Sequence, residues 1–249
     1  MKRSYLSVIL FSVCIVICIS LISDSNADTW TDNFDGNKLE EVWEFRDHNN
    51  KQTEYEVKDG FLRITNPGNW GHTTADKPMI ERDVPDSAAD DITVSGIFSS
   101  DPDKPADAWI GIFIYSDDQL NYACLLFGGE SNQPQKALIG SMIKSAWSDH
   151  GHPQMGFDVP LHLKLVKEGD TFSGYFRKDD KDDWSLAQNK SWNHNFKVKK
   201  VGIGFMNNWG GQTVTFLIDQ LSIEGAGIKP FSVEPGNKLA TTWGDLKID

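Results

Sequence analysis

Three short segments of this 249-residue chain combine side chains that suit recognition of a polar ligand. Each places a tryptophan beside amide, imidazole or carboxylate groups and close to a glycine. The candidate ligand-binding residues are Trp70, His72, Trp147, Asp149, His150, Asn207, Asn208 and Trp209. A sugar has an apolar C–H face that stacks on an indole, and hydroxyls that bond to such polar groups. The pattern therefore favours a glycan or polysaccharide as the partner.

We expect these three segments to be loops on a rigid scaffold, which is where binding sites concentrate. On this hypothesis, Trp70, Trp147 and Trp209 converge on one open groove. The alternative is that the three indoles are buried and plug the ends of the fold, because tryptophan is a mostly buried residue type.

The central segment from Ile92 to Phe127 predicts three consecutive β-strands. Residues 92–98 alternate in polarity, whereas residues 109–115 and 122–127 are almost wholly apolar. β-Branched and aromatic residues dominate, and turn-forming residues separate the three parts. We expect the two apolar strands to lie in the middle of a sheet covered on both faces, and the alternating strand to have one face in water.

Strand and turn signals recur along the rest of the chain. The strongest is a hairpin over residues 55–64, with Asp59-Gly60 as its turn. Further strands are predicted at 78–84, 136–143, 161–166, 172–177, 201–206 and 214–223. Since no helical segment of any length is predicted, the fold class is all-β, and so many strands require two stacked sheets or a barrel.

Residues 1–27 have the features of a secretory signal peptide. Lys2 and Arg3 precede an uninterrupted apolar run over residues 4–22, and Ser25-Asn26-Ala27 supplies small residues for cleavage. We therefore expect a secreted, periplasmic or cell-surface protein. The apolar run is almost long enough to span a bilayer, so an uncleaved membrane anchor is the alternative.

Charge and cysteine content narrow the possibilities further. The net charge of −12 would repel nucleic acid and anionic membranes, so neither is an expected partner. Cys14 and Cys18 lie in the apolar run, which leaves Cys124 with no partner for an internal disulfide. Stability must then come from burial of apolar side chains, and the chain is long enough to build one large core.

The domain prediction is simple: one folded domain over residues 28–225, followed by a linker and tail over residues 226–249. Glycines and prolines at positions 227, 230, 235 and 236 favour a flexible end. The alternative is that the last residues add a strand or bind a partner.

Several motifs, taken in order, resemble the concanavalin A-like (laminin G-like) β-sandwich superfamily. They are Asp32-Asn-Phe-Asp-Gly36, the hairpin at 57–64, and residues 77–84, 110–122, 201–205 and 216–221. The likeness is to an uncharacterised bacterial branch related to the accessory domain of β-xylosidases. It implies a two-sheet antiparallel jelly-roll β-sandwich that binds glycan or serves as an accessory module. At residues 179–183 this chain has an acidic turn, where members of the resembling family usually have Asp-Gly before a tryptophan. The resemblance therefore implies no function for this turn.

Catalysis finds little support among the strand carboxylates. Glucanases of this superfamily carry Glu-x-Asp-x-x-Glu on one face of a strand, and no such run occurs here. Glu81 and Asp83 are the nearest pair and are expected to share a face. We expect them to form a solvated strand edge rather than a catalytic pair. The chain also has no Gly-x-Ser-x-Gly nucleophile elbow and no phosphate-binding loop.

Two groups of residues are candidates for binding a metal ion. His150 and His152 could hold a metal from one loop, but without a third ligand we favour polar loop residues. Asp32, Asp35 and Asp219 lie near the two ends of the domain, which are close together in the resembling fold, and a structural Ca²⁺ there would offset acidic repulsion. No other cofactor is predicted.

Three functions remain after these observations. The first is a secreted, non-catalytic, lectin-like carbohydrate-binding module. The second is a glycoside hydrolase or lyase with an unrecognised acid pair. The third is a structural or adhesion module whose sandwich presents the tail.

Overall fold

The computed structural model describes residues 27–47, 52–71, 77–116, 120–129, 135–188 and 192–229. The predicted signal peptide up to residue 26, His72 and the tail from residue 230 lie outside these ranges. Within them, no helix has the length and apolar character needed to cross a membrane.

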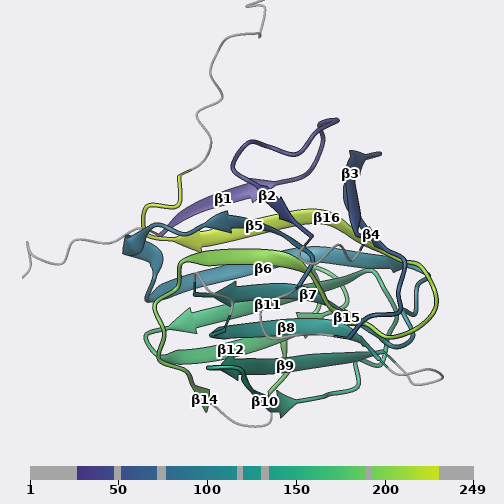
Figure 1. The fold of residues 1–249 in the computed structure, drawn as a ribbon. Helices are drawn as coiled ribbons and strands as arrows, with labels where there is room; N and C mark the ends of the chain where they lie inside the picture. Colours follow the sequence, from purple (N-terminus) through teal and green to yellow (C-terminus); the bar gives the residue numbers. More distant parts are fainter. Residues whose placement is uncertain are drawn as a thin grey trace, which may run out of the picture.

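Sixteen strands in the described ranges form two antiparallel sheets, which are stacked as layers (Figure 1). The larger, nine-stranded sheet has the order β13-β12-β11-β6-β16-β4-β3, with β1 beside β16 and β14 beside β12. Its strands are β1 (Asp28–Asp32), β3 (Glu54–Lys58), β4 (Phe61–Asn66), β6 (Asp91–Asp101), β11 (Leu161–Glu168), β12 (Thr171–Arg177), β13 (Ser185–Leu186), β14 (Trp192–Asn193) and β16 (Val214–Gly225).

The smaller, seven-stranded sheet has the order β10-β9-β8-β7-β15-β5-β2. Its strands are β2 (Glu44–Arg46), β5 (Met79–Asp83), β7 (Ala108–Tyr115), β8 (Tyr122–Gly129), β9 (Lys136–Ile143), β10 (Ala146–Gly151) and β15 (Lys200–Asn208). One 3₁₀ turn, η1 (Asp86–Ala88), precedes β6. The all-β, two-sheet antiparallel prediction is confirmed.

The main core lies between the two sheets and follows from the period of two along each strand. Leu161, Leu163 and Leu165 of β11 point inward and are completely buried, while His162 and Lys164 between them are partly exposed. β8 is buried along its whole length, as predicted for a strand covered on both faces. Each fully buried leucine stabilises the fold by about 1.5–3 kcal/mol.

The outer face of the seven-stranded sheet carries a second, smaller apolar cluster. Phe113, Tyr122 and Leu126 belong to its buried centre, and Trp109 and Trp147 pack on it while staying partly exposed. Five glycines alternate with inward side chains and so lie on this outer face: Gly111, Gly128, Gly140, Gly202 and Gly204. At Gly140, an added Cβ would come within 2.1 Å of the Trp147 ring, so only glycine lets this indole lie against the sheet.

Two of the three predicted loops are strands instead. Trp147, Asp149 and His150 belong to β10, and Asn207 and Asn208 end β15. β10 follows β9 through a two-residue turn in which Lys144 and Ser145 have φ of 48° and 70°. These residue types are not the usual Asn-Gly or Asp-Gly signal of such a turn, so the hairpin had no clear local signature in the sequence.

Candidate functional site

Asn66, at the end of β4, organises the end of the sandwich that carries Trp70. Its Oδ1 accepts hydrogen bonds from Trp70 Nε1 at 3.0 Å and from Asn208 Nδ2 at 3.1 Å. Its own Nδ2 donates to Thr53 Oγ1 at 2.8 Å. The polar atoms of Trp70 and Asn208 thus join β4 to β15, and Trp70 also packs against the main core. Both residues are part of the scaffold of the site.

Trp209 is the most exposed large apolar side chain in the part of the chain that the structure describes. It follows β15 directly, and 53% of its surface is accessible. Its main-chain N–H donates to the carbonyl of Asp107 at 2.8 Å, and its ring lies against Gly71. This indole is therefore held at the backbone and presented to solvent at the end where β7 begins.

Asn207 and Trp109 are directly opposite each other on β15 and β7. A bulge between Phe205 and Asn207 shifts the register, so that Asn207 shares the outer face with Trp109. Asn207 is only 3% exposed, yet its Oδ1 accepts no hydrogen bond from the residues that the structure describes. A buried amide oxygen without a donor is costly to the free energy of folding.

The exposed edge strand β10 contributes a second set of side chains to this face. Trp147 lies over Gly140 and contacts Tyr122, with ring centres 6.4 Å apart. Asp149 pairs with His152, whose ring stacks on Trp109 with centres 6.3 Å apart and planes inclined by 22°. His152 therefore connects the β10 edge to Trp109.

We call the outward-facing set the indole track. Its members are Trp109, Trp147, Asp149, His152, Asn207 and Trp209. Trp109 and His152 were not among the residues selected from the sequence. Trp109 begins an apolar strand, and the sequence does not show on which face of the sheet it lies. His152 is a candidate in the sequence only as a metal ligand.

The three indoles named from the sequence do not meet at one point. Trp70 and Trp209 lie at the same end of the sandwich, because Trp70 forms a β-bridge with Asn208, the residue before Trp209. Trp147 lies in a cross-strand row with Tyr115, six residues along β7 from Trp109. That distance is about 20 Å at the usual rise per strand residue. An extended ligand, rather than a single compact sugar, fits this spread.

His150 points to the other side of β10, between the two sheets. Its Nε2 lies 2.9 Å from Ser141 Oγ, and its ring stacks on Trp192 with centres 4.1 Å apart and planes inclined by 3°. His152 lies on the outer face with Asp149, so the two histidines cannot share one metal ion. His150 is thus a packing residue of this end of the core.

Acidification is expected to destabilise the same end through His194. This side chain is 3% exposed, its Nε2 lies 2.8 Å from the Met142 carbonyl, and burial lowers its pKa below the ordinary 6.5. The unfolded chain then binds a proton more readily than the folded one, so stability is complete above about pH 6.5 and falls as the pH drops toward the lowered pKa. Melting temperatures between pH 7 and pH 5 should fall less for His194→Gln than for the wild type. Equal slopes for the two proteins would contradict the assignment.

The three aspartates named for Ca²⁺ are not gathered around one point. Asp32 is buried, and its carboxylate accepts hydrogen bonds from Phe34 N at 2.8 Å and Trp43 Nε1 at 3.3 Å. Asp35 and Asp219 are exposed. No group of three or more His, Cys, Asp or Glu residues in the described ranges is arranged to hold a metal. The Ca²⁺ ion stays a prediction, which calorimetry with and without a chelator tests.

Glu81 differs from its expected place on a solvated edge. β5 lies between β2 and β15, and Glu81 has no exposed surface. Its carboxylate accepts a hydrogen bond from the Tyr115 hydroxyl and pairs with Arg46 and with Lys200, whose Nζ is 2.9 Å away. Asp83 is 3.3 Å from the same Nζ, which confirms that the two acids share a face. The Glu81 carboxylate is engaged by two cations and a hydroxyl, as in a structural ion-pair network.

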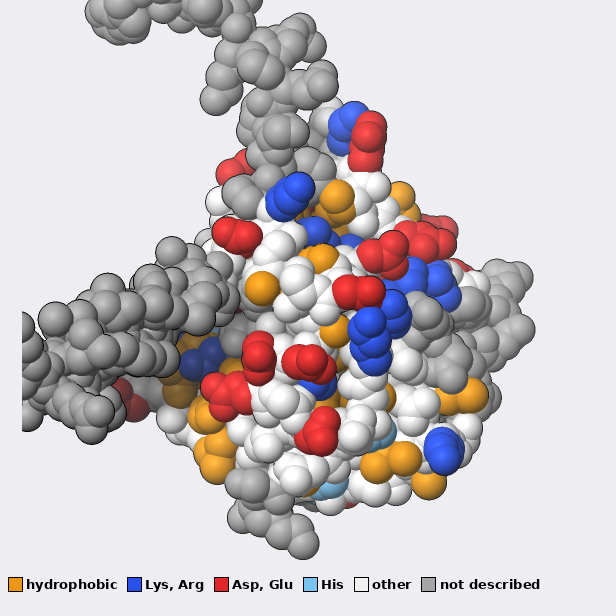
Figure 2. All heavy atoms as spheres, turned by 90° about the vertical axis from the view of Figure 1, so that its left-hand side faces the viewer, with side chains coloured by type: hydrophobic (Ala, Val, Ile, Leu, Met, Phe, Trp, Pro, Cys, Tyr) orange, Lys and Arg blue, Asp and Glu red, His pale blue; other side chains and the backbone are white. Residues whose placement is uncertain are grey.

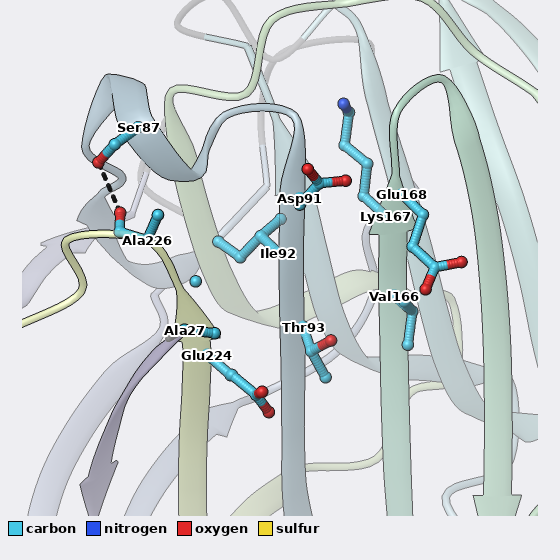
Figure 3. Close-up of a pocket in the computed structure, with 11 residues that line it drawn as sticks. Ala27, Ser87, Asp91, Ile92, Thr93, Val166, Lys167, Glu168, Glu224 and Ala226 are labelled. Carbon is cyan, nitrogen blue, oxygen red and sulfur yellow. Dashed lines mark hydrogen bonds between the residues drawn. The ribbon is translucent and has the colours of Figure 1, made fainter. Parts of the chain in front are cut away.

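Two pockets lie on the nine-stranded sheet. One of about 580 Å³ is lined by Thr53, Thr65, Glu54 and neighbouring residues, close to the Asn66 network. The other, of about 310 Å³, lies near η1, where Asp91, Glu168 and Glu224 project from three strands (Figure 3). Figure 2 faces the end of the molecule with η1 and shows acidic and basic side chains intermingled there. Neither pocket contains an aromatic platform.

Comparisons with known proteins find similar folds but no related sequence. No protein-family model matches the chain, and no curated protein matches it. The GH43 protein BlXynB from Bacillus licheniformis matches at 18% identity and a TM-score of 0.61, over 79% of this chain and 39% of that one. The Bacteroides ovatus xyloglucan PUL GH43B matches at 18% identity and a TM-score of 0.60, over 78% of this chain and 39% of that one. The CBM2 module of the Lactobacillus casei BL23 phage J-1 evolved Dit matches at 9% identity and a TM-score of 0.54, over 83% of this chain and 100% of that one.

The chain thus spans about two-fifths of the length of the GH43 structures that it matches. At 9–18% identity, these likenesses show a shared β-sandwich fold alone.

Proposed function

We propose that this protein is an exported, non-catalytic carbohydrate-binding module of the concanavalin A-like type, which holds a glycan along the indole track. The sugar rings stack on Trp209, Trp109 and Trp147. Asn207, Asp149 and His152 bond to the hydroxyls between them. Export follows from the predicted signal peptide, and the site of action is the medium, the periplasm or the cell surface.

The observation that carries the proposal is the exposure of Trp209 two residues after Asn207, whose buried amide oxygen is unsatisfied and which lies opposite Trp109. An indole with 53% of its surface in water forgoes the burial that this residue type usually gains. Two residues earlier in the chain, the Asn207 Oδ1 has no donor among the described residues, and this residue is only 3% exposed. A saccharide offers a C–H face to the exposed indole and a hydroxyl donor to the amide. The matched structures include GH43 proteins and a CBM2 module, which supports a role toward carbohydrate.

A glycan array probed with residues 28–249 tests the proposal. We expect binding to extended polysaccharide fragments and weaker binding to their monosaccharides, because the track is long. An array without any bound glycan would favour the third function, a sandwich that presents the tail to a partner.

Hydrolysis receives less support than binding. The Glu81 carboxylate is fully buried and held by Arg46, Lys200 and Tyr115. Its acidic neighbours, Asp83 on β5 and Glu44 opposite it on β2, pair with the same Lys200 and are largely exposed. Release of reducing sugar from a polysaccharide panel, lost in Glu81→Gln while the fold is kept, would replace the binding proposal with the enzymatic one.

A further inference from the structure

The outer face of the nine-stranded sheet carries a straight row of polar side chains across five strands. From β12 to β1, each residue lies directly opposite the next: Tyr175, Lys164, Ser95, Ser222 and Thr31. The hydroxyls of Thr31 and Ser222 are 2.8 Å apart and bond to each other. Because neighbouring strands are about 4.8 Å apart, this polar row spans about 19 Å.

Two cations share one indole at the Tyr175 end of the polar row. Lys164 Nζ lies 4.3 Å from the centre of the Trp184 ring and 4.9 Å from that of Tyr175. The Arg177 guanidinium carbon lies 4.4 Å from the Trp184 centre. Such contacts hold both cations against the sheet and fix where their charges point.

Of the two cations, Arg177 is paired with Asp180, whereas Lys164 has no carboxylate partner among the described residues. Burial, followed by the like charge of Arg177, lowers the pKa of Lys164. Arg177 bonds to Asp180, yet its Nε is buried with no hydrogen-bond acceptor among the residues that the structure describes. Lys164 forms no ion pair with a carboxylate in the ranges that the structure covers, and Glu224 acts on it only through space. A ligand carboxylate beside Lys164 would give it the missing partner and offset the repulsion by Arg177.

We propose that the polar row binds an acidic saccharide, with a uronate carboxylate on Lys164 and Arg177 and sugar hydroxyls on Ser95, Ser222 and Thr31. A hydroxyl-lined row suits a chain of hydroxyl-bearing rings. Nucleic acid and anionic membranes carry far denser negative charge and are repelled by a protein of net charge −12. The polar row is on the opposite sheet from the indole track, so this inference stands independently of the proposed function.

Isothermal titration with trigalacturonate, and with neutral galactotriose as the matched probe, tests the inference. The acidic trimer should bind at least about tenfold more tightly, since hydrogen bonds between charged groups are the strong ones. Lys164→Gln should lower its affinity by about tenfold or more, and Lys164→Arg should retain it. Lys58→Gln removes an exposed lysine from the same sheet and should change the affinity by less than about twofold.

Several results would overturn the inference. One is no binding of trigalacturonate by the wild type, and another is an equal loss in Lys58→Gln. Inorganic phosphate competing as tightly as the trimer would show a general anion site instead of a saccharide site. Trp209→Ala should leave trigalacturonate binding unchanged. Weaker binding of trigalacturonate by this variant would mean that the acidic sugar binds at the indole track instead of the polar row.

Discussion

Glu81→Leu should lower the free energy of unfolding by about 3–5 kcal/mol, the range seen when one partner of a buried ion pair is removed. Glu81 has no exposed surface, and Lys200 and Arg46 are only 13% and 25% exposed. Without the carboxylate, two cations and the Tyr115 hydroxyl remain close together in a place that water reaches poorly. Urea denaturation followed by tryptophan fluorescence measures the change.

Asp83→Leu is the matched control for this prediction. Asp83 lies on the same strand and also faces Lys200, at 3.3 Å, but its side chain is 85% exposed. Solvent screens such a pair, so we expect a loss of less than about 1 kcal/mol. Similar losses in the two variants would mean that the Glu81 network is not the stabilising element described above.

Trp209→Ala should weaken binding of the best array glycan by about 30-fold, which corresponds to roughly 2 kcal/mol, the usual threshold for a dominant binding residue. Trp209 is half exposed, so its removal should change the melting temperature little. The ring offers an apolar platform that no neighbouring exposed residue in the described ranges replaces. Titration of the purified variants with the array glycan measures the loss.

Tyr55→Ala controls for removal of an exposed aromatic side chain. Tyr55 is 42% exposed and lies on β3, the edge of the other sheet, where it contacts Phe45. Its replacement should leave glycan affinity unchanged. Unchanged affinity in Trp209→Ala, or equal losses in both variants, would remove Trp209 from the site.

The sequence was most informative where the signal is local and repeats every two residues. The hairpin at 55–64, the alternating β11 and the almost wholly apolar β7 and β8 were all predicted. A strand buried on one face alternates in polarity, and a strand buried on both faces is a continuous apolar run, so both are visible in the sequence. This information sufficed for the two-sheet architecture.

The site was harder to predict, because it depends on pairings between distant residues. Whether Trp147 lies in a loop or a strand depends on its pairing with Met142 across an unusual turn. The burial of Glu81 depends on Lys200, 119 positions away, and on a three-residue strand with no alternation to reveal it. The inward turn of His150 depends on Trp192. None of these pairings leaves a local pattern.

The glycines on the outer face of the seven-stranded sheet also limit how this protein could diversify. A new side chain at Gly140 would collide with the Trp147 ring, and one at Gly204 would come within 2.4 Å of the Pro78 carbonyl. Most point substitutions in the middle of this face would therefore damage the fold before they could alter specificity. Libraries aimed at new ligands should be confined to the strand ends around Trp209 and to the segment after β10, where lineages of this sandwich have room to vary.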